Sequence, residues 1–219
     1  MLTKDLINNN IPRLQLQDTV GKALQLLDDY RITHLPVVSD GKFLGLISEE
    51  DLLDVDDKRL PMELLQEFFI PASVSYNVHF LNAVSISIQH DTNIIAVVNT
   101  DEYLGVITNF DLLKTLGNFS GANEIGGIIV LKMEASQFHL SEISRIVESN
   151  DCTILHLNTT RDADTGMLMV TLHINKREIY SLLATFQRYE YEVTYSYGVG
   201  DYEDELSDNY NHLMHYIRI

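Results

Sequence analysis

Hydrophobic and polar residues alternate along the chain at spacings that predict a regular succession of helices and strands. In residues 20–27 the apolar positions fall three and four apart, as on one face of a helix, and Asp18 is expected to cap that helix. Two short apolar runs at 34–38 and 43–47, separated by a glycine-containing turn, predict paired strands. Ser48 then precedes three acidic residues and is expected to be the N-cap of a second helix. The predicted order of this stretch is therefore helix, strand, strand, helix.

The same order returns sixty residues later. Residues 33–53 align without a gap to residues 93–113 and share eight identical residues of 21. The second copy predicts a helix over 80–88, strands over 94–98 and 103–107, and a helix capped by Thr108. A unit of this size cannot bury its own sheet, so we expect the two units to pack sheet to sheet into one module.

The last third of the chain has a different pattern. A stretch rich in glycine and polar residues at 118–125 indicates a linker. The elements predicted after it are strands at 128–133, 152–159, 167–174 and 191–197 and helices at 139–149 and 179–186. Their order, β-α-β-β-α-β, is that of a ferredoxin-like fold. The expected fold class is therefore α/β (α+β), with a two-repeat module followed by a ferredoxin-like domain.

A shared motif gives the two repeats a family resemblance. The pattern Gly, two hydrophobic residues, Ser or Thr, two variable residues and Asp occurs as GLISEED at 45–51 and GVITNFD at 105–111. With the upstream strand THLPVV at 33–38, this resembles the CBS domain, which occurs in tandem pairs. Ala96 departs from the proline that is frequent in that strand of the family. The resemblance covers about residues 1–117.

The resemblance implies a regulatory protein that binds an adenosine ligand between the repeats: AMP, ADP, ATP or S-adenosylmethionine. Asp51 and Asp111 would accept hydrogen bonds from ribose hydroxyls, and Ser48 and Thr108 would meet phosphate at a helix N-terminus. The other expected ligand-binding residues lie on or beside the first strand of each repeat: Thr33, His34, Leu35, Pro36, Ile95 and Ala96. A Ser or Thr cap with an acid three residues later is also an ordinary capping box, so the motif fits a pair with empty clefts as well.

The β-α-β-β-α-β segment resembles the ACT domain, a small regulatory module of amino-acid metabolism. Amino-acid-binding members carry Asp-x-x-Gly before the first helix, where this chain has Ala135 and Phe138. The resemblance therefore implies a role in homodimer formation rather than amino-acid binding. The order CBS–CBS–ACT resembles the bacterial acetoin-utilisation regulatory type. The expected domains are a first CBS repeat (1–54), a helical linker (55–70), a second repeat (71–117), a linker (118–125), the ACT-like domain (126–197) and an acidic tail with a short C-terminal helix (198–219).

Charge narrows the classes of partner. The chain has 15 Lys and Arg residues against 32 Asp and Glu residues, a net charge of -17, and no segment is basic. Nucleic acid and anionic membrane surfaces are therefore poor partners. No apolar run is long enough to span a bilayer, the start MLTKDLINNN lacks the apolar core of a signal peptide, and a cytoplasmic location is expected. With a single cysteine, Cys152, a disulfide framework and a CxxC metal site are excluded.

The small number of basic residues limits how many phosphates a ligand of this chain can carry. Lys114 is the only one in residues 72–119, whereas the first repeat has Arg13, Lys22, Arg31 and Lys42 and is the better candidate for an anion. We expect AMP, ADP or a neutral or cationic adenosyl ligand in preference to ATP. No catalytic or metal-binding motif occurs, so we expect neither an enzyme nor a resident cofactor. The alternative to a sensor is a ligand-free scaffold that docks and regulates a partner enzyme or transporter.

Overall fold

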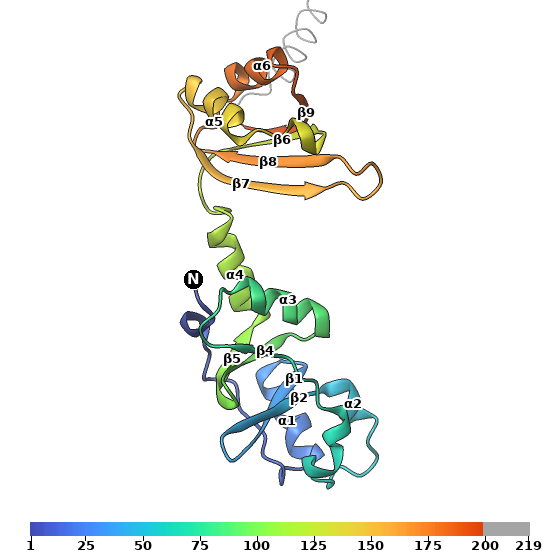
Figure 1. Ribbon diagram of the computed structural model, residues 1–219. Helices are drawn as coiled ribbons and strands as arrows, with labels where there is room; N and C mark the ends of the chain where they lie inside the picture. The colour runs from blue at the N-terminus through green and yellow to red at the C-terminus, as the bar shows by residue number, and fades with distance from the viewer. Residues whose placement is uncertain (199–219) are drawn as a thin grey trace, which may run out of the picture. The chain divides into compact units, whose positions relative to one another are not determined.

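The computed structural model describes residues 1–198, which form two compact units that divide between Leu116 and Gly117 (Figure 1). Apart from Gly198, the predicted acidic tail and C-terminal helix lie outside the described residues. Within residues 1–198, no helix is long and apolar enough to cross a membrane.

The first unit contains both repeats, and the predicted order of helix, strand, strand and helix is confirmed in each. The first repeat consists of α1 (Val20–Tyr30), β1 (His34–Ser39), β2 (Lys42–Ser48) and α2 (Glu49–Leu53). The second consists of α3 (Leu81–His90), β4 (Ile94–Asn99), β5 (Glu102–Thr108) and α4 (Asn109–Phe119), preceded by the short β3 (Ser73–Ser75). Two 3-10 helices, η1 (Thr3–Leu6) and η2 (Met62–Phe68), precede the first helix of each repeat. The helix α4 continues two residues into the predicted linker.

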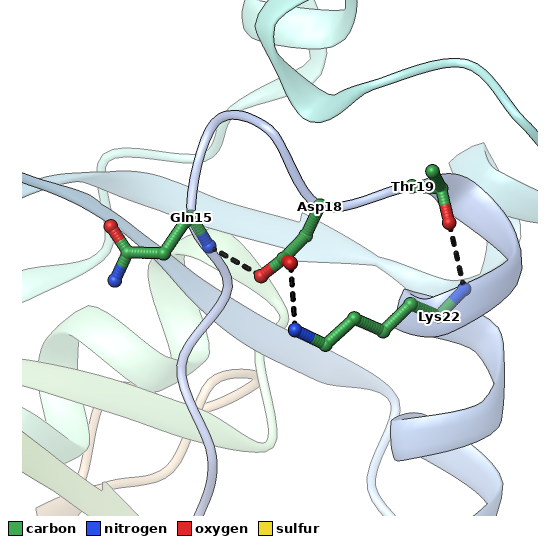
Figure 2. Close-up of polar contacts among 4 residues, drawn as sticks. All are labelled: Gln15, Asp18, Thr19 and Lys22. Carbon is green, nitrogen blue, oxygen red and sulfur yellow. Dashed lines mark hydrogen bonds and ion pairs between the residues drawn. The ribbon is translucent and has the colours of Figure 1, made fainter.

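The expected cap of α1 is wrong by one residue. Thr19 is the N-cap, because its extended backbone precedes Val20 and its hydroxyl accepts a hydrogen bond of 3.3 Å from the Lys22 amide (Figure 2). Asp18 instead accepts hydrogen bonds from the Gln15 amide at 2.8 Å and from Lys22 Nζ at 2.6 Å. The carboxylate therefore holds the loop before the helix rather than the helix itself.

A segment from outside each repeat crosses the glycine-containing strand of that repeat. Ile70 exchanges two backbone hydrogen bonds of 2.8 Å with Leu46 in β2. In the equivalent place, Asn8 exchanges hydrogen bonds of 2.7 and 3.2 Å with Val106 in β5. The start of the chain is thus bonded to the second repeat, and the connection between the repeats is bonded to the first. The two repeats are interlocked and fold as one unit.

The motif glycines make these crossings possible. A Cβ atom on Gly45 would lie 2.6 Å from the Cβ of Phe69, and one on Gly105 would lie 2.5 Å from Cγ2 of Ile7. Gly105 also has a φ of 147°, which strains any residue with a side chain. Glycine in this motif is therefore a packing requirement of the interlocked pair.

Three apolar clusters hold the first unit together. One packs α1 against β1 and one packs α3 against β4. The third lies between the repeats and consists of Leu46, Ala72, Ile94, Ala96 and Val106. Strands of both repeats meet in this cluster, in agreement with the expected packing of sheet against sheet, and the pair Lys42 and Glu102 also joins the strands into one sheet of order β1-β2-β5-β4-β3.

The second unit has the predicted β-α-β-β-α-β order. Its elements are β6 (Gly127–Met133), α5 (Leu140–Ser149), β7 (Ile154–Arg161), β8 (Leu168–Ile174), α6 (Tyr180–Arg188) and β9 (Glu192–Tyr197), with a short 3-10 helix, η3 (Ala135–Gln137), before α5. The sheet order is β7-β8-β6-β9 and the paired strands are antiparallel. Both helices lie on one face of the sheet (Figure 1), where Ile143 and Phe186 join the core of this unit. The fold is ferredoxin-like.

The crossing at Gly45 gives a prediction for stability. Gly45→Ala should lower the free energy of unfolding by about 1–3 kcal/mol, because the new methyl group must displace the backbone at Phe69. Gly117→Ala is the matched control: it lies in α4, its new methyl group would have no atom within 4 Å, and it should stabilise the helix by up to about 1 kcal/mol. Urea unfolding of both variants measures the difference, and equal effects at the two positions would contradict the crossing.

Candidate functional site

A cleft of about 580 Å³ opens in the first unit between residues of both repeats. This volume is within the range of small-molecule sites. Its lining comes from the ends of β1, β2 and α3, the first turns of α2 and α4, and the crossing segment: Thr33, His34, Ser48, Glu49, Glu50, Asp51, Ile70, His90, Asp91, Thr92, Asn93 and Asn109.

The motif residues of the first repeat form a capping box at the edge of this cleft. Ser48 donates a hydrogen bond of 2.5 Å to Oδ2 of Asp51 and accepts one of 3.1 Å from the Asp51 amide. The Asp51 carboxylate is thereby fixed through one oxygen, while Oδ1 accepts no hydrogen bond from any residue of the described chain. A fixed carboxylate with a free oxygen suits the hydroxyls of a vicinal diol.

The second motif has the same local geometry but lies elsewhere. Thr108 donates a hydrogen bond of 2.7 Å to Oδ2 of Asp111 and accepts one of 3.1 Å from the Asp111 amide. Neither residue lines the cleft described above, whereas their neighbour Asn109 does. The two repeats therefore have equivalent caps, but only the cap of the first repeat lies at this cleft.

A histidine joins the two repeats at the floor of the cleft. His34 Nδ1 lies 2.9 Å from the Thr33 hydroxyl and 3.2 Å from Oδ1 of Asn93, and Asn93 is the equivalent of Thr33 in the second repeat. The His34 side chain is 8% exposed. Burial lowers the pKa of the imidazole, partly opposed by the hydrogen bond to Asn93 and by the charges of Asp91 and Asp51. The ring is therefore neutral near pH 7 and takes part as a hydrogen-bonding group.

Thr92 and Asn109 of the second repeat line the cleft and are held together by Ser87. The Thr92 carbonyl accepts hydrogen bonds of 2.6 Å from Ser87 Oγ and 3.1 Å from Asn109 Nδ2. Ser87 Oγ also lies 2.8 Å from Oδ1 of Asn109. This network holds Asn109, at the start of α4, against the end of α3.

The structure brings together some of the predicted site residues and separates the rest. Thr33, His34, Ser48 and Asp51 line the cleft. The predicted adenine-flanking residues of both strands are buried and do not line it: Leu35, Pro36, Ile95 and Ala96. Their backbones are also occupied, since the Pro36 carbonyl accepts from the Leu14 amide and the Ala96 amide donates to the Ala72 carbonyl.

Sequence reasoning missed most of the cleft wall contributed by the second repeat. His90, Asp91, Thr92 and Asn93 follow α3, and only Asn93 has an equivalent, Thr33, that the motif had singled out. The sixty-residue offset was the one usable signal, because it maps Thr33 onto Asn93. That both positions face one cleft depends on how the repeats pack, which the offset does not encode.

The charge of the cleft differs from the sequence expectation. Four carboxylates line it, from Glu49, Glu50, Asp51 and Asp91, and within residues 1–198 no lysine or arginine does. The basic residues of the first repeat therefore do not make this cleft an anion site.

One of these basic residues, Lys22, is paired with Asp18 in the loop before α1 (Figure 2). Although partial burial opposes it, the hydrogen bonds from Lys22 and Gln15 hold the pKa of the Asp18 carboxyl below its usual value.

The second unit has a smaller cavity of about 390 Å³ beside the loop between β6 and α5. Its polar lining includes Glu142, whose Oε2 accepts a hydrogen bond of 2.9 Å from the Tyr191 hydroxyl. Burial and this carboxylate raise the pKa of Tyr191 to about 12. Across the described chain, no three His, Cys, Asp or Glu residues are grouped to hold a metal ion.

Comparison with known proteins gives a match to one domain family and a likeness in fold. Residues 4–58 match the family model of the CBS domain. An uncharacterized protein from Methanocaldococcus jannaschii is 31% identical over 52 residues, and the match spans 24% of this chain and 28% of that relative. The chain thus covers about a quarter of the length of that curated relative.

Two solved structures resemble the chain in fold. A CBS domain pair/ACT domain protein from Thermotoga maritima aligns with a TM-score of 0.50 at 21% identity, covering 54% of this chain and 98% of that one. A putative acetoin utilization protein from Vibrio cholerae aligns with a TM-score of 0.48 at 22% identity, covering 56% and 95%. The first of these likenesses confirms the mixed α and β architecture expected from the sequence, with the fold of a CBS domain pair.

Burial of His34 predicts a pH dependence of stability. The folded state disfavours the charged imidazole, so the unfolded chain binds the extra proton as the pH falls through the ordinary histidine value of 6.5. The contribution of His34 to stability is therefore full above that pH and declines below it. In urea unfolding at pH 7.5 and pH 5.5, His34→Gln should lose less stability on acidification than the unsubstituted protein. A larger loss in the variant would show that the folded state binds the proton.

Proposed function

We propose that this chain is a regulatory protein whose CBS pair binds an adenosine-containing ligand in the cleft of the first unit. The observation that carries the proposal is the Asp51 carboxylate, which the Ser48 cap holds through Oδ2 and leaves free at Oδ1 on the edge of a cleft of small-molecule size. A ribose presents two adjacent hydroxyls, and such an oxygen can accept a hydrogen bond from them.

The remaining lining supports recognition of a flat, polar ring. The Ile70 side chain supplies an apolar contact, and the Thr33, His34 and Asn93 group supplies both donors and acceptors. These groups belong to different repeats, so a bound ligand contacts both. Because a ligand shifts an equilibrium only through differential contacts, bridging the two repeats gives it a means to favour one arrangement of the pair.

A second candidate function is a ligand-free scaffold, and exposed apolar side chains favour it. Ile88 is 77% exposed, Phe110 is 74% exposed and Leu113 is 67% exposed, all on helices of the second repeat. Where such side chains form a contiguous patch, they mark a protein interface. In the scaffold hypothesis these surfaces dock a partner enzyme or transporter while the cleft stays empty.

The second unit is proposed to form the homodimer. Within residues 1–198 its ferredoxin-like sheet ends at β7 and β9, and an unpaired strand edge can be continued by a second copy. Ala135 and Phe138 stand where an amino-acid-binding ACT domain has Asp and Gly, so pairing is favoured over ligand binding. The acetoin-utilisation type remains an association through the domain order.

Ligand binding is tested by thermal unfolding with adenosine, AMP, ADP, ATP and S-adenosylmethionine. A ligand at 100 times its dissociation constant adds about 2.7 kcal/mol, which raises the Tm by several degrees. Asp51→Asn should abolish this rise by removing the charged acceptor. Asp111→Asn is the matched control, since it disturbs an equivalent cap outside the cleft and should keep the rise. No rise with any compound, from protein free of carried-over nucleotide, would favour the scaffold.

The dimer is tested by sedimentation of the full chain, whose mass is 25.0 kDa. We expect a species of about twice that mass. Leu155→Asp, on the open edge strand β7 where the side chain is 42% exposed, should convert it to a monomer. Leu53→Asp, on α2 with 60% exposure, should leave the dimer intact. Dissociation by the Leu53 variant alone would place the interface on the CBS pair instead.

A further inference from the structure

The second unit has another cavity on the face of its sheet opposite to α5 and α6. These helices cover one face (Figure 1), where Ile129 and Leu172 are buried in the core. Successive side chains of a strand point to opposite faces, so the neighbouring residues Ile128 and Thr171 lie on the other face. There the cavity has a volume of about 570 Å³, which is within the range of small-molecule sites.

A row of side chains from all four strands forms part of the floor of this cavity. His156 on β7 lies directly opposite His173 on β8, which lies opposite Ile128 on β6, and Ile128 lies opposite Tyr197 on β9. All four residues line the cavity. Side chains directly opposite each other on one face of a sheet have Cβ atoms about 5 Å apart. The row therefore presents three flat rings and an apolar side chain side by side, a surface that suits a flat aromatic ligand.

The segment before β6 forms one wall of the cavity. The Glu124 amide donates a hydrogen bond of 2.9 Å to the Gly121 carbonyl, so the segment is held by its own backbone. A Cβ atom on Gly126 would lie 2.8 Å from Nε2 of His173. Glycine at that position therefore lets the segment lie directly against the imidazole. The residues predicted as a linker thus contribute to the cavity.

The cavity also contains a cation without a partner in the described chain. Arg177 lines it and forms no ion pair or side-chain hydrogen bond within residues 1–198. Its backbone lies beside the end of β9, because a Cβ atom on Gly198 would meet the Arg177 carbonyl oxygen. The guanidinium belongs to the same end of the sheet as Tyr197. A guanidinium presents its donors as a planar fork that matches the two oxygens of a carboxylate.

The charge of this cavity differs from that of the cleft in the first unit. Glu124 supplies the one carboxylate of the described lining, and it is not paired with Arg177. The cleft in the first unit has four carboxylates and no lysine or arginine among its described lining residues. An anionic group therefore finds an available counter-charge in the second unit and not in that cleft.

We propose that the cavity of the second unit binds a flat aromatic compound that carries one carboxylate. The ring lies on the row formed by His173, Ile128 and Tyr197, and the carboxylate pairs with Arg177. The site is at the opposite end of β6 from the smaller cavity beside the loop to α5, which Met133 lines. The inference goes beyond the proposed function and does not depend on the adenosine site.

The matched probes are naphthalene carboxylate, naphthalene carboxamide and adamantane carboxylate, which separate the charge from the flat ring. Isothermal titration of the full chain should give a dissociation constant about tenfold lower for naphthalene carboxylate than for the amide, since only the carboxylate forms charge-assisted hydrogen bonds with the guanidinium. Adamantane carboxylate has the charge without the flat ring and should bind more weakly than naphthalene carboxylate. Equal affinity for naphthalene carboxylate and either other probe, or no binding of any probe, would overturn the proposal.

The assigned cation is tested by Arg177→Gln. This variant should raise the dissociation constant of naphthalene carboxylate to about that of the amide and leave the affinity for the amide unchanged. Arg161→Gln, an exposed residue of β7 outside the lining, makes the same change in charge and should alter neither affinity. Equal effects of the two substitutions would show that the carboxylate responds to the general charge of the surface and would contradict the site.

The location is tested by filling the floor of the cavity. Thr171→Phe, directly opposite Asn158 in the lining, should abolish binding of naphthalene carboxylate because its ring occupies the space of the ligand. Thr160→Phe is the matched control: Thr160 lies two residues further along β7 on the same face, outside the lining, and this variant should keep the binding. Aromatic residues are favoured in strands, so both variants should keep the Tm of the unsubstituted protein. Full binding by Thr171→Phe would overturn the proposal.

Discussion

The architecture of the first unit depends on two backbone crossings, each over a glycine that leaves room for it. At Gly45 the chain that connects the repeats passes over β2, and at Gly105 the start of the chain passes over β5. In each repeat, the glycine-containing strand is crossed and hydrogen-bonded by a segment that precedes the first helix of the other repeat. A tandem pair bound in this way folds together, and its shared cluster around Leu46 and Val106 becomes a common core.

The same arrangement creates the cleft. The crossing segment brings Ile70 beside the Ser48 cap, and the joined repeats set His34 against Asn93. The capping box has two roles here: it starts α2 and it fixes one oxygen of Asp51 while leaving the other free. Stability and ligand recognition are thus built from the same few hydrogen bonds. The acid-rich first turn of α2 and Asp91 line the same cleft with four carboxylates.

Periodicity and the internal repeat predicted the elements well, since helix and strand spacing are local properties of residues such as those in β1 and β4. The sequence also identified the capping pairs, because Ser48 and Asp51 are three positions apart and interact wherever the helix forms. It misplaced the cap of α1, where Thr19 and Asp18 both have suitable side chains and the loop geometry decides between them. The presence of Thr92 and Asp51 in one cleft, and the absence of Arg13 and Lys42 from it, follow from long-range packing that no local pattern encodes.

The central claim is that an adenosine compound occupies the cleft lined by Asp51 and Asn93. A crystal structure of the full chain grown with the adenosine compound that raises the Tm most tests it most directly. We predict density in this cleft, with ribose hydroxyls within hydrogen-bond distance of Asp51 Oδ1. An empty cleft at saturating ligand, or density beside Thr108 and Asp111 instead, would contradict the account.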